Sequence, residues 1–600
     1  MKRIKPTLIF VALTILFLVA SIANTSASPI DTVFFTVSME NPSTHYFHVE
    51  LECTGLDLQE YQFKMPAWTP GYYWILDLAK NVTDFQVRDE RGEALAWEKT
   101  KKDTWVVEAP NAKKLTVSYD VFAYQRSVAE PWLDDGRAFI SPTGIFMYLN
   151  EKLDYPVNIK VNPFADWKNV STGLKEVKNE PNTFIASNFD ELYDCPILAG
   201  NMEVLSFQLN EVPYTIVMEN PAEFDRKTYT SDFRKIAKSA TELIGDVPYD
   251  KYTYLIMDQG FGGLEHRNSM AVFSNSNYDI TNSEGYKGWL SFIAHEFFHL
   301  YNVKTIRPIE LGPFDYSQEN YTNMLWVAEG FTVYYEYLVL NRAGLFSRKE
   351  VLDALSHTFA KFENANGRKL LSARQASFDT WLNFFNWNNH TDNTTISYYD
   401  IGCALGMLLD LKIRNETNNE KSLDDVMRSI YYDFHKKQNR GYTDDEFRAV
   451  CEKIAGCSLE EIFNYAASTV PMDYQKYLSF AGIEINLNPE KEISFGVSLR
   501  KNGDNWIVSD IDRNSPAWQK GLSIDNQILS INGKAVNDES IKMLSNPKNT
   551  GKLSLKVSGR AGEKVIVIET FGKASCDYKM VPVAQMSTKQ KTILESWIQE

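Results

Sequence analysis

The hydrophobic and polar positions in the first third of the chain alternate with a period of two. Short alternating runs cover residues 32–38, 45–51 and 115–121, and turn residues such as Thr69-Pro-Gly71 separate runs of this kind. This period puts successive side chains on opposite faces of a sheet, so each run predicts a half-buried strand. We therefore expect an N-terminal β-sandwich-like domain, of immunoglobulin type, over residues 28–205.

The pattern changes near residue 206, where helical periodicity takes over. Two strand candidates remain at residues 214–218 and 252–257. Ser/Thr-x-x-Glu capping boxes mark three helix starts, at Ser347, Thr443 and Ser458. These signals predict a mostly helical domain with a small sheet over residues 206–487.

Short strands return in the last part of the chain. Residues 486–492 are polar and contain a proline, which predicts a linker. The following residues contain several apolar runs and one helix near residues 538–544, a mixture typical of a small binding module. A polar tail, with helical character from Lys589, ends the sequence. The predicted segments are a signal peptide (1–27), an N-terminal β domain (28–205), a catalytic domain (206–487), a small C-terminal domain (488–573) and a tail (574–600).

The first 27 residues have the pattern of a secretory signal. Three positive charges in the first five residues precede an apolar run at residues 8–20 and a small-residue exit, Thr25-Ser26-Ala27. The apolar run is short for a membrane span, although an uncleaved anchor remains an alternative. We expect export, to the periplasm or the medium, and no stable membrane span after cleavage.

Charge and cysteine content narrow the remaining classes. The formal net charge of −16 at pH 7 disfavours nucleic acid and anionic membranes as partners. The six cysteines show no C-x-x-C spacing, so they predict neither a disulfide scaffold nor a second metal site. Whether Cys451 and Cys457 form a disulfide or stay as free thiols remains open.

One stretch of the helical region carries metal chemistry, Ser291-Phe-Ile-Ala-His-Glu-Phe-Phe-His-Leu300. His295 and His299 are four residues apart, so on a helix both imidazoles can reach one ion. Glu296 lies beside them, where it can act as general base to a water molecule activated by zinc. Apolar residues at helical spacing predict a buried opposite face, formed by Trp289, Phe292, Ile293, Phe297 and Leu300.

A catalytic zinc ion needs a third protein ligand. Glu329, in Trp326-Val-Ala-Glu-Gly-Phe-Thr332, begins a strongly apolar segment. From the residues alone two interpretations stand: Glu329 is the third ligand, on a helix packed against the first, or it caps the first turn of its own helix.

The combined motifs resemble known families. His-Glu-x-x-His followed by Glu-Gly-Phe-Thr resembles the gluzincin metallopeptidases, which include thermolysin and the large aminopeptidases. Gly262-Gly-Leu-Glu-His266 with Ser269, and His295-Glu-Phe-Phe-His-Leu-Tyr-Asn-Val-Lys304 with Arg307-Pro308, more closely resemble the glycyl aminopeptidase family. Members of that family begin with a β domain and carry a C-terminal PDZ domain. The resemblance implies a thermolysin-like catalytic domain and one zinc ion, with His295, His299 and Glu329 as ligands.

The resemblance also implies roles for further residues. Glu296 matches the general base, and Glu265 matches the glutamate that anchors the substrate amine in aminopeptidases. Gly262 and Gly263 would let an edge strand lie against the substrate backbone. Tyr399 matches the tyrosine that donates its hydroxyl to the tetrahedral oxyanion.

Some of these assignments have alternatives. A glycine turn with a solvated acid is the alternative for Glu265, and His266 either orients Glu265 or the substrate or is structural. The family usually has a tryptophan at position 301, here Tyr301, and a lysine at position 401, here Ile401. The second departure leaves Tyr398 as an alternative to Tyr399.

The small C-terminal domain resembles a PDZ domain. Ser515-Pro-Ala-Trp-Gln-Lys-Gly-Leu522 matches its short turn and helix, and Asp525-Asn-Gln-Ile-Leu-Ser-Ile-Asn-Gly533 matches a strand ending in an Asn-Gly turn. The resemblance implies a groove for an extended peptide whose carboxylate is held near Phe495, Gly496 and Val497. A structural lid that binds nothing in trans is the alternative.

The patterns predict a multidomain α+β protein with an export signal and a zinc site, and the resemblance implies that it is an exported zinc aminopeptidase. It would hydrolyse the first peptide bond of peptides with a free amino terminus, and the resemblance implies a preference for small residues such as Gly or Ala. The alternatives are a zinc endopeptidase, and a PDZ-based peptide-binding adaptor with a vestigial zinc site.

Overall fold

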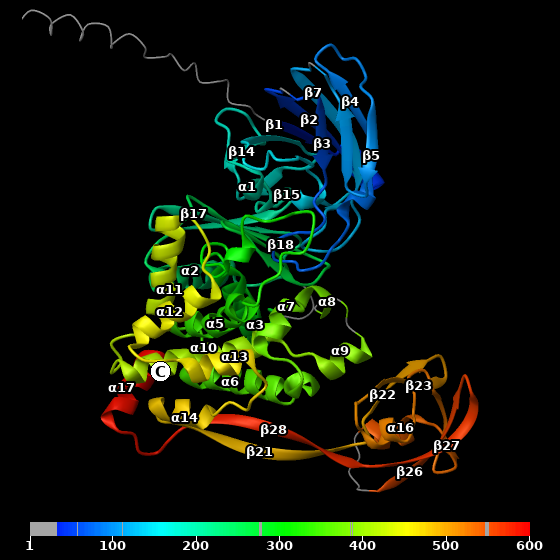
Figure 1. Cartoon of the computed structure of the whole chain (residues 1–600), viewed down its shortest axis with the longest axis vertical. Coiled ribbons are helices and arrows are strands. Elements are labelled where there is room, and N and C mark those ends of the chain that lie inside the picture. The colour runs from blue at the N-terminus through cyan, green and yellow to red at the C-terminus, as the bar shows by residue number, and fades with distance from the viewer. Residues whose placement is uncertain are drawn as a thin grey trace, which may run out of the picture.

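The computed structural model describes residues 33–56, 58–110, 112–274, 279–383, 386, 388–545 and 551–600. The predicted signal at residues 1–27 lies outside the described residues. A β-rich domain lies at the top of Figure 1, a mostly helical domain in the middle, and a small β domain at the lower right. The predicted multidomain α+β class is therefore confirmed.

Two packed sheets build the N-terminal domain around one core. In β2 (Tyr46–Thr54), Phe47, Val49, Leu51 and Cys53 are buried and alternate with more exposed residues, as the period of two predicts. The larger sheet runs in the order β13 (Lys175–Glu176), β14 (Thr183–Ala186), β11 (Val157–Asn162), β1 (Val33–Ser38), β2, β7 (Lys114–Phe122) and β4 (Val82–Asp89). The second sheet is β10 (Tyr148–Leu149), β3 (Glu60–Lys64), β6 (Thr104–Glu108) and β5 (Trp97–Lys101). A third, at the base of the domain, is β12 (Asn169–Thr172), β15 (Ile197–Gly200), β9 (Arg137–Ile140) and β8 (Trp132–Leu133).

A five-stranded sheet forms the front of the catalytic domain. Its order is β16 (Glu203–Leu209), β17 (Val212–Met218), β18 (Tyr252–Met257), β20 (Ser269–Phe273) and β19 (Gly263–Glu265). Both predicted strands, 214–218 and 252–257, are present. Because β16 begins at Glu203, the domain boundary expected near residue 206 falls inside this strand.

Helix α5 packs between α3 and α10 at the centre of the catalytic domain. The capping boxes at Ser347 and Thr443 are confirmed. The box at Ser458 is wrong, because α13 begins at Glu460 and the Ser458 hydroxyl accepts from Glu460 N. The helices up to the end of this domain are α1 (Phe189–Tyr193), α2 (Arg226–Ile244), α3 (Ser283–Phe298), α4 (Leu325–Ala328), α5 (Gly330–Arg342), α6 (Arg348–Glu363), α7 (Ala373–Phe378), α8 (Thr380–Asn383), α9 (Asn389–Thr394), α10 (Tyr398–Glu416), α11 (Leu423–Ile430), α12 (Asp444–Ala455), α13 (Glu460–Ala467) and α14 (Tyr474–Leu478).

The predicted linker at residues 486–492 is wrong, because those residues lie inside a strand. β21 (Ile483–Ser494) pairs antiparallel with β28 (Phe571–Pro582) along its whole length. This two-stranded ribbon carries the small domain at one end and meets the helical domain at the other (Figure 1). The boundaries expected at residues 488 and 573 therefore fall inside paired strands.

The small domain has the elements expected of a PDZ fold, including a strand that ends in an Asn-Gly turn. Asn532 and Gly533 have φ values of 52° and 75°, as a tight hairpin turn requires. Its elements are β22 (Val497–Asn502), β23 (Asn505–Ile511), α15 (Pro516–Gln519), β24 (Gln527–Ile531), β25 (Lys534–Ala535), α16 (Asp538–Ser545), β26 (Lys552–Gly559) and β27 (Gly562–Glu569). Asn393 of α9 joins it to the catalytic domain, since its side chain donates to Ile511 O (3.3 Å) and accepts from Arg513 N (2.7 Å).

The C-terminal helix α17 (Thr588–Trp597) packs against the catalytic domain. Trp597 is 1% exposed, and its indole N–H donates to the hydroxyl of Tyr334 on α5. The helix expected from Lys589 is therefore confirmed and is part of the main core, whereas residues 574–582 of the predicted tail belong to β28.

Replacing Trp597 with alanine should destabilise the catalytic domain by about 3–5 kcal/mol, because it empties a large buried site and removes a hydrogen bond. Calorimetric unfolding of the full chain should show its transition at a clearly lower temperature than wild type. Trp518→Ala is the matched control, since Trp518 is 51% exposed. Equal transition temperatures for the two variants would mean that the tail does not stabilise the domain.

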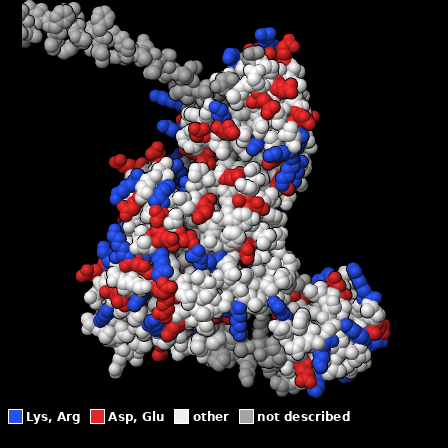
Figure 2. Space-filling model, viewed as in Figure 1, with Lys and Arg blue, Asp and Glu red and all other residues white. Residues whose placement is uncertain are grey.

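The surface charges, the helix lengths and the cysteines can be described directly from the structure. Acidic and basic side chains are interspersed over the face shown in Figure 2. Within the described ranges, no helix combines the length and apolarity that a membrane crossing needs. All six cysteines are free, including Cys451 and Cys457.

Candidate active site

The two predicted metal-binding histidines lie at the end of α3. The Asn282 side chain caps the start of this helix by accepting from Gly285 N. His295 lies in its last turn, and His299 directly follows its last residue in a right-handed helical conformation. Because the spacing is four residues, the two Nε2 atoms are only 3.0 Å apart. The predicted buried face is confirmed for Trp289, Ile293, Phe297 and Leu300, whereas Phe292 is half-buried and lies on the side of the site.

The Nδ1 atom of each imidazole lies within hydrogen-bond distance of an acceptor oxygen. His295 Nδ1 lies 2.8 Å from Glu336 Oε2, and His299 Nδ1 lies 2.8 Å from Asn302 O. An ionised carboxylate and a carbonyl only accept hydrogen bonds, so in the neutral rings both Nδ1 atoms donate. The lone pairs of both Nε2 atoms are therefore directed at the same point.

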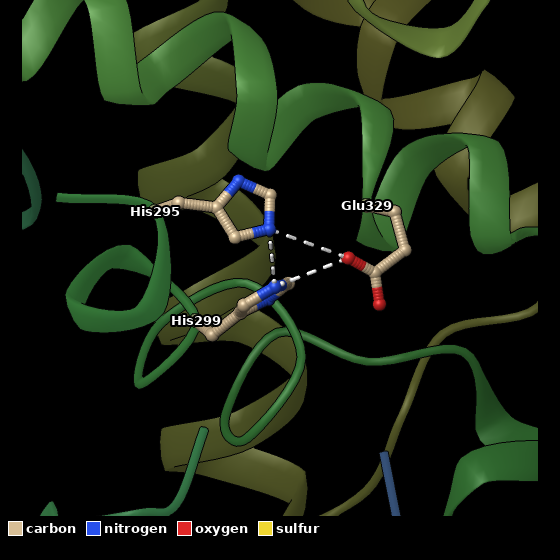
Figure 3. Close-up of side chains that lie close together, drawn as sticks. All are labelled: His295, His299 and Glu329. Atoms are coloured by element: carbon tan, nitrogen blue, oxygen red, sulfur yellow. Dashed lines mark hydrogen bonds and ion pairs between the residues drawn. The ribbon is translucent and has the colours of Figure 1, made fainter. Parts of the chain in front are cut away.

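Glu329, between α4 and α5, completes this group (Figure 3). Its Oε2 atom lies 3.1 Å from His299 Nε2 and 3.6 Å from His295 Nε2. This oxygen is buried without a hydrogen-bond partner, and Glu329 makes no capping hydrogen bond at the start of α5. The capping interpretation of Glu329 is therefore not supported. Three converging lone pairs suit a cation, and two imidazoles with one carboxylate form a donor set that fits zinc.

Asn302 and a close glycine contact fix the position of Glu329. The Asn302 side-chain amide donates to Val327 O (2.8 Å) and Ala328 O (2.9 Å), directly before Glu329. A Cβ on Gly330 would overlap the backbone of Gly402 in α10. Gly330 therefore lets α5 and α10 cross closely, which fixes the position of the metal-binding group relative to α10.

Glu296 lies beside this group and is 6% exposed. The pKa of its carboxyl group is raised to about 7. Burial is the largest cause, and Glu265 and Glu329 also raise this pKa, whereas His295 and His299 lower it. A carboxylate of this basicity is suited to accept a proton near neutral pH.

Glu265 stands at the edge of the catalytic sheet, on β19. It is 5% exposed, and its Oε1 atom has no hydrogen-bond partner. Lys304 Nζ lies 3.8 Å from Oε1 and 2.9 Å from Asp194 Oδ1. Burial lowers the pKa of Lys304, but Asp194 and Glu265 outweigh this effect and the net shift is upward. The solvated-acid interpretation of Glu265 is therefore wrong, because the carboxylate is buried.

Glycines let other backbone segments lie close to the carboxylates of Glu265 and Glu296. Gly71, from the N-terminal domain, has φ +90°, and a Cβ there would lie 2.8 Å from Glu265 Oε1. A Cβ on Gly263 would collide with Glu296 Oε1. Gly262 has φ +92° and lies with Gly263 in the wall of the same cavity. The edge strand thus passes directly beside Glu296.

His266 is outside the set of residues that line the cavity. Its ring is 2% exposed, and Nδ1 lies 3.1 Å from Asp194 Oδ1. Because Asp194 also pairs with Lys304, Asp194 and Lys304 link the side chain of His266 to the carboxylate of Glu265. The structural interpretation of His266 is favoured.

Of the two tyrosines at the start of α10, Tyr399 lines the cavity. Its ring stacks on that of His295, with centroids 6.1 Å apart and an angle of 23° between planes. The Tyr398 hydroxyl lies 3.0 Å from Thr380 Oγ1. Burial and Glu329 raise the pKa of Tyr399 well above its ordinary value, so its hydroxyl remains a hydrogen-bond donor.

The metal-binding group, Glu296, Glu265 and Tyr399 open into one cavity of about 860 Å³ between the N-terminal and catalytic domains. Its lining includes Gly262, Gly263, Glu265, His295, Glu296, His299, Glu329 and Tyr399, together with residues of the N-terminal domain between Gly71 and Pro131. The predicted metal, base and amine-anchoring residues are thus brought to one place.

The residues expected around the PDZ groove lie where β22 begins. Gly496 has φ +68°, and its carbonyl accepts from Asp512 N. Phe495 is 2% exposed, and its side chain belongs to the core of this domain, so that side chain is not available to a peptide. Helix α16 packs beside β22, which begins at Val497.

Sequence reasoning missed four residues that hold the site. Glu336 lies on α5, seven residues after Glu329, so helical spacing would have placed it on the same side of the helix as the Glu329 that precedes α5. Asn302 and Lys304 were part of a recognised motif but had no assigned role. Asp194 comes from a distant segment, and no local signal marks it.

Known family models match three parts of the chain. The family model described as "Peptidase M61 N-terminal domain" matches residues 35–201, and "M61 glycyl aminopeptidase" matches residues 288–405. A PDZ domain model matches residues 484–558. The search of curated proteins found no match.

One solved structure shares the fold over nearly the whole chain. The chain is similar to an aminopeptidase N family protein from Idiomarina loihiensis, with 24% identity, a TM-score of 0.85, and coverage of 95% of this chain and 100% of the other. An M1 zinc metallopeptidase mutant from Deinococcus radiodurans, bound to a Tyr-Ser-Ala substrate, has 12% identity and a TM-score of 0.47, with coverage of 74% and 94%. Legionella pneumophila aminopeptidase A, in complex with aspartic acid, has 11% identity and a TM-score of 0.47, with coverage of 95% and 61%.

Proposed function

Because the chain belongs to the M61 glycyl aminopeptidase family, we propose that it is an exported zinc aminopeptidase that removes small amino-terminal residues, such as Gly or Ala, from peptides. The observation that carries this proposal is the convergence of His295, His299 and Glu329 beside Glu296 and the buried carboxylate of Glu265. Export rests on the signal-like segment at residues 1–27.

The residues of the chain divide the chemistry between them. When bound by His295, His299 and Glu329, zinc supplies a Lewis acid that polarises the scissile carbonyl. Glu296 accepts a proton from the attacking water and later passes it to the leaving amine. The Tyr399 hydroxyl donates a hydrogen bond to the oxygen on which negative charge develops.

Glu265 would select the amino terminus. A buried carboxylate needs a cationic partner, and the α-ammonium of a peptide supplies one. An internal peptide bond has no cation at this position. Among the described residues, Glu265 would then have Lys304 as its only cationic partner in the site, and the rest of its buried carboxylate would stay unpaired. Such a penalty disfavours the endopeptidase alternative.

The adaptor alternative rests on the PDZ domain alone. In this chain the set of zinc ligands is complete, and an acceptor orients the Nδ1 atom of both His295 and His299. A vestigial site would not need this arrangement. We therefore propose that the PDZ domain serves the peptidase, and that peptides with a free carboxylate bind beside β22.

Purified protein should cleave glycyl and alanyl amides faster than leucyl amide. A chelator should abolish cleavage, and added zinc should restore it, because the Lewis acid is required for attack on the carbonyl. The rate of amine release, with and without chelator, is the measurement. Cleavage that resists the chelator, or no cleavage by zinc-loaded protein, would overturn the proposed function.

Replacing Glu336 with glutamine should lower zinc affinity by about 10–100-fold, since Glu336 accepts from His295 Nδ1 and orients that ring. Competition with a chromogenic chelator measures the affinity. Glu284→Gln is the control, because Glu284 is exposed in the first turn of α3. Equal affinities for the two variants would remove Glu336 from the support of the site.

A further inference from the structure

The groups of the site set the direction in which a substrate lies. β19 is the edge strand of the catalytic sheet, so an extended peptide can lie beside it. With the ammonium at Glu265, the scissile bond lies near Gly263, which is next to Glu296. The chain then continues past Gly262 toward Phe261. Residues after the scissile bond therefore meet the part of the cavity around Phe261.

Exposed aromatic side chains line this cavity. Phe261 is 67% exposed, Tyr124 is 48%, and Trp74 and Phe122 are each 38% exposed. Phe261 comes from the catalytic domain, and the other three come from the N-terminal domain. Large apolar side chains left in contact with water around a site indicate a surface that binds apolar groups.

Neighbouring rings pack against two of these four side chains, Tyr124 and Phe122. Tyr124 stacks on Trp132, with centroids 4.3 Å apart and an angle of 20° between planes. Arg126 also contacts Trp132, because its guanidinium carbon lies over the Trp132 ring, 4.9 Å from the ring centroid. Phe122 packs against Tyr46 at 5.3 Å. Aromatic surfaces that are already ordered bind a peptide with little loss of side-chain entropy.

The size of the cavity points to more than a single residue. Its volume of about 860 Å³ lies near the upper end of the range of about 300–1,000 Å³ for pockets that enclose a drug-sized ligand. A glycyl or alanyl amide would fill only a small part of it. The space extends well beyond what the zinc-binding group and Glu265 require.

We propose that this cavity binds the second and third residues of the substrate through Phe261, Trp74, Phe122 and Tyr124. The preferred substrates are then peptides of at least three residues, with a small amino-terminal residue followed by apolar or aromatic ones, and single-residue amides are cleaved less efficiently. This inference rests on the proposed function, because Glu265 and Glu296 define the direction of the peptide.

The test compares Ala-Leu-Phe-amide with Ala-Ser-Ser-amide, which have the same charge and the same scissile residue. The value of kcat/KM should be at least about tenfold higher for the apolar peptide, since burying one Leu or Phe side chain accounts for that much. Phe261→Ala and Tyr124→Ala should each lower this ratio at least threefold. Trp97→Ala is the matched control, because Trp97 is a 43% exposed aromatic of the N-terminal domain outside the cavity lining, and it should keep the wild-type ratio.

Binding of both peptides to zinc-loaded Glu296→Gln protein separates this inference from the proposed function. Tighter binding of the apolar peptide that depends on Phe261 supports the aromatic subsite, even if no peptide is cleaved. Cleavage of both peptides with equal kcat/KM and equal affinity would overturn the subsite and leave the aminopeptidase function intact. A ratio unchanged in Phe261→Ala and Tyr124→Ala would also overturn it.

Discussion

Replacing Glu296 with glutamine should lower kcat for alanyl substrates by about 10²–10⁴-fold, the usual contribution of a positioned general base. Glutamine has the same shape but cannot accept a proton at neutral pH. The zinc content should stay near one ion per chain, because the ligands are His295, His299 and Glu329, which the substitution leaves in place. Steady-state kinetics together with metal analysis measure both quantities.

The control for this variant is Glu284→Gln on the same helix. Glu284 is exposed in the first turn of α3, far along the helix from the histidines, so kcat should match wild type. If Glu296→Gln kept its zinc and more than a tenth of wild-type kcat, another group would have to act as the base.

Replacing Glu265 with glutamine should raise KM for free-amine substrates by about 30-fold or more. The reason is the loss of the charge that pairs with the substrate ammonium in a buried site, an effect of about 2 kcal/mol or more. The side chain keeps its length, so its packing against Gly71 is retained. Michaelis–Menten kinetics with alanyl amide measure the effect.

An amino-blocked peptide is the internal control for Glu265→Gln. Its slow cleavage by wild type does not depend on an ammonium, so the substitution should leave that rate unchanged or increase it. An unchanged KM for free-amine substrates would show that Glu265 does not bind the amine. A parallel loss on blocked and free substrates would indicate damage to the site as a whole.

The sequence was a good guide wherever local periodicity decides the structure. The alternation in β2 and the helical spacing around His295 each predict a buried face, and the structure has both. The segment at residues 486–492 shows the limit. Its polar residues and proline are typical of a loop, but its backbone pairs with β28, a strand about 80 residues further along the chain. Pairing at that distance leaves no local pattern.

The same distinction applies to the site. His295, Glu296 and His299 form a local motif, so spacing alone identifies them. Glu329 and Glu265 needed the resemblance to known peptidases, since one carboxylate in an apolar segment has several uses. The support of Glu265 by Lys304, Asp194 and Gly71 depends on segments that meet only in the folded chain. The aromatic surface was invisible for the same reason, because Phe261 and Tyr124 come from different domains.

The central claim is that this zinc site reads a free amino terminus, and one ratio tests it most directly. It is kcat/KM for Ala-Leu-Phe-amide divided by kcat/KM for the same peptide acetylated at its amino terminus, measured with zinc-loaded full-length protein. A site built around a buried ionic partner should favour the free peptide by about 10⁴-fold. A ratio below about ten, with both peptides cleaved in a chelator-sensitive reaction, would contradict the claim and identify an endopeptidase instead.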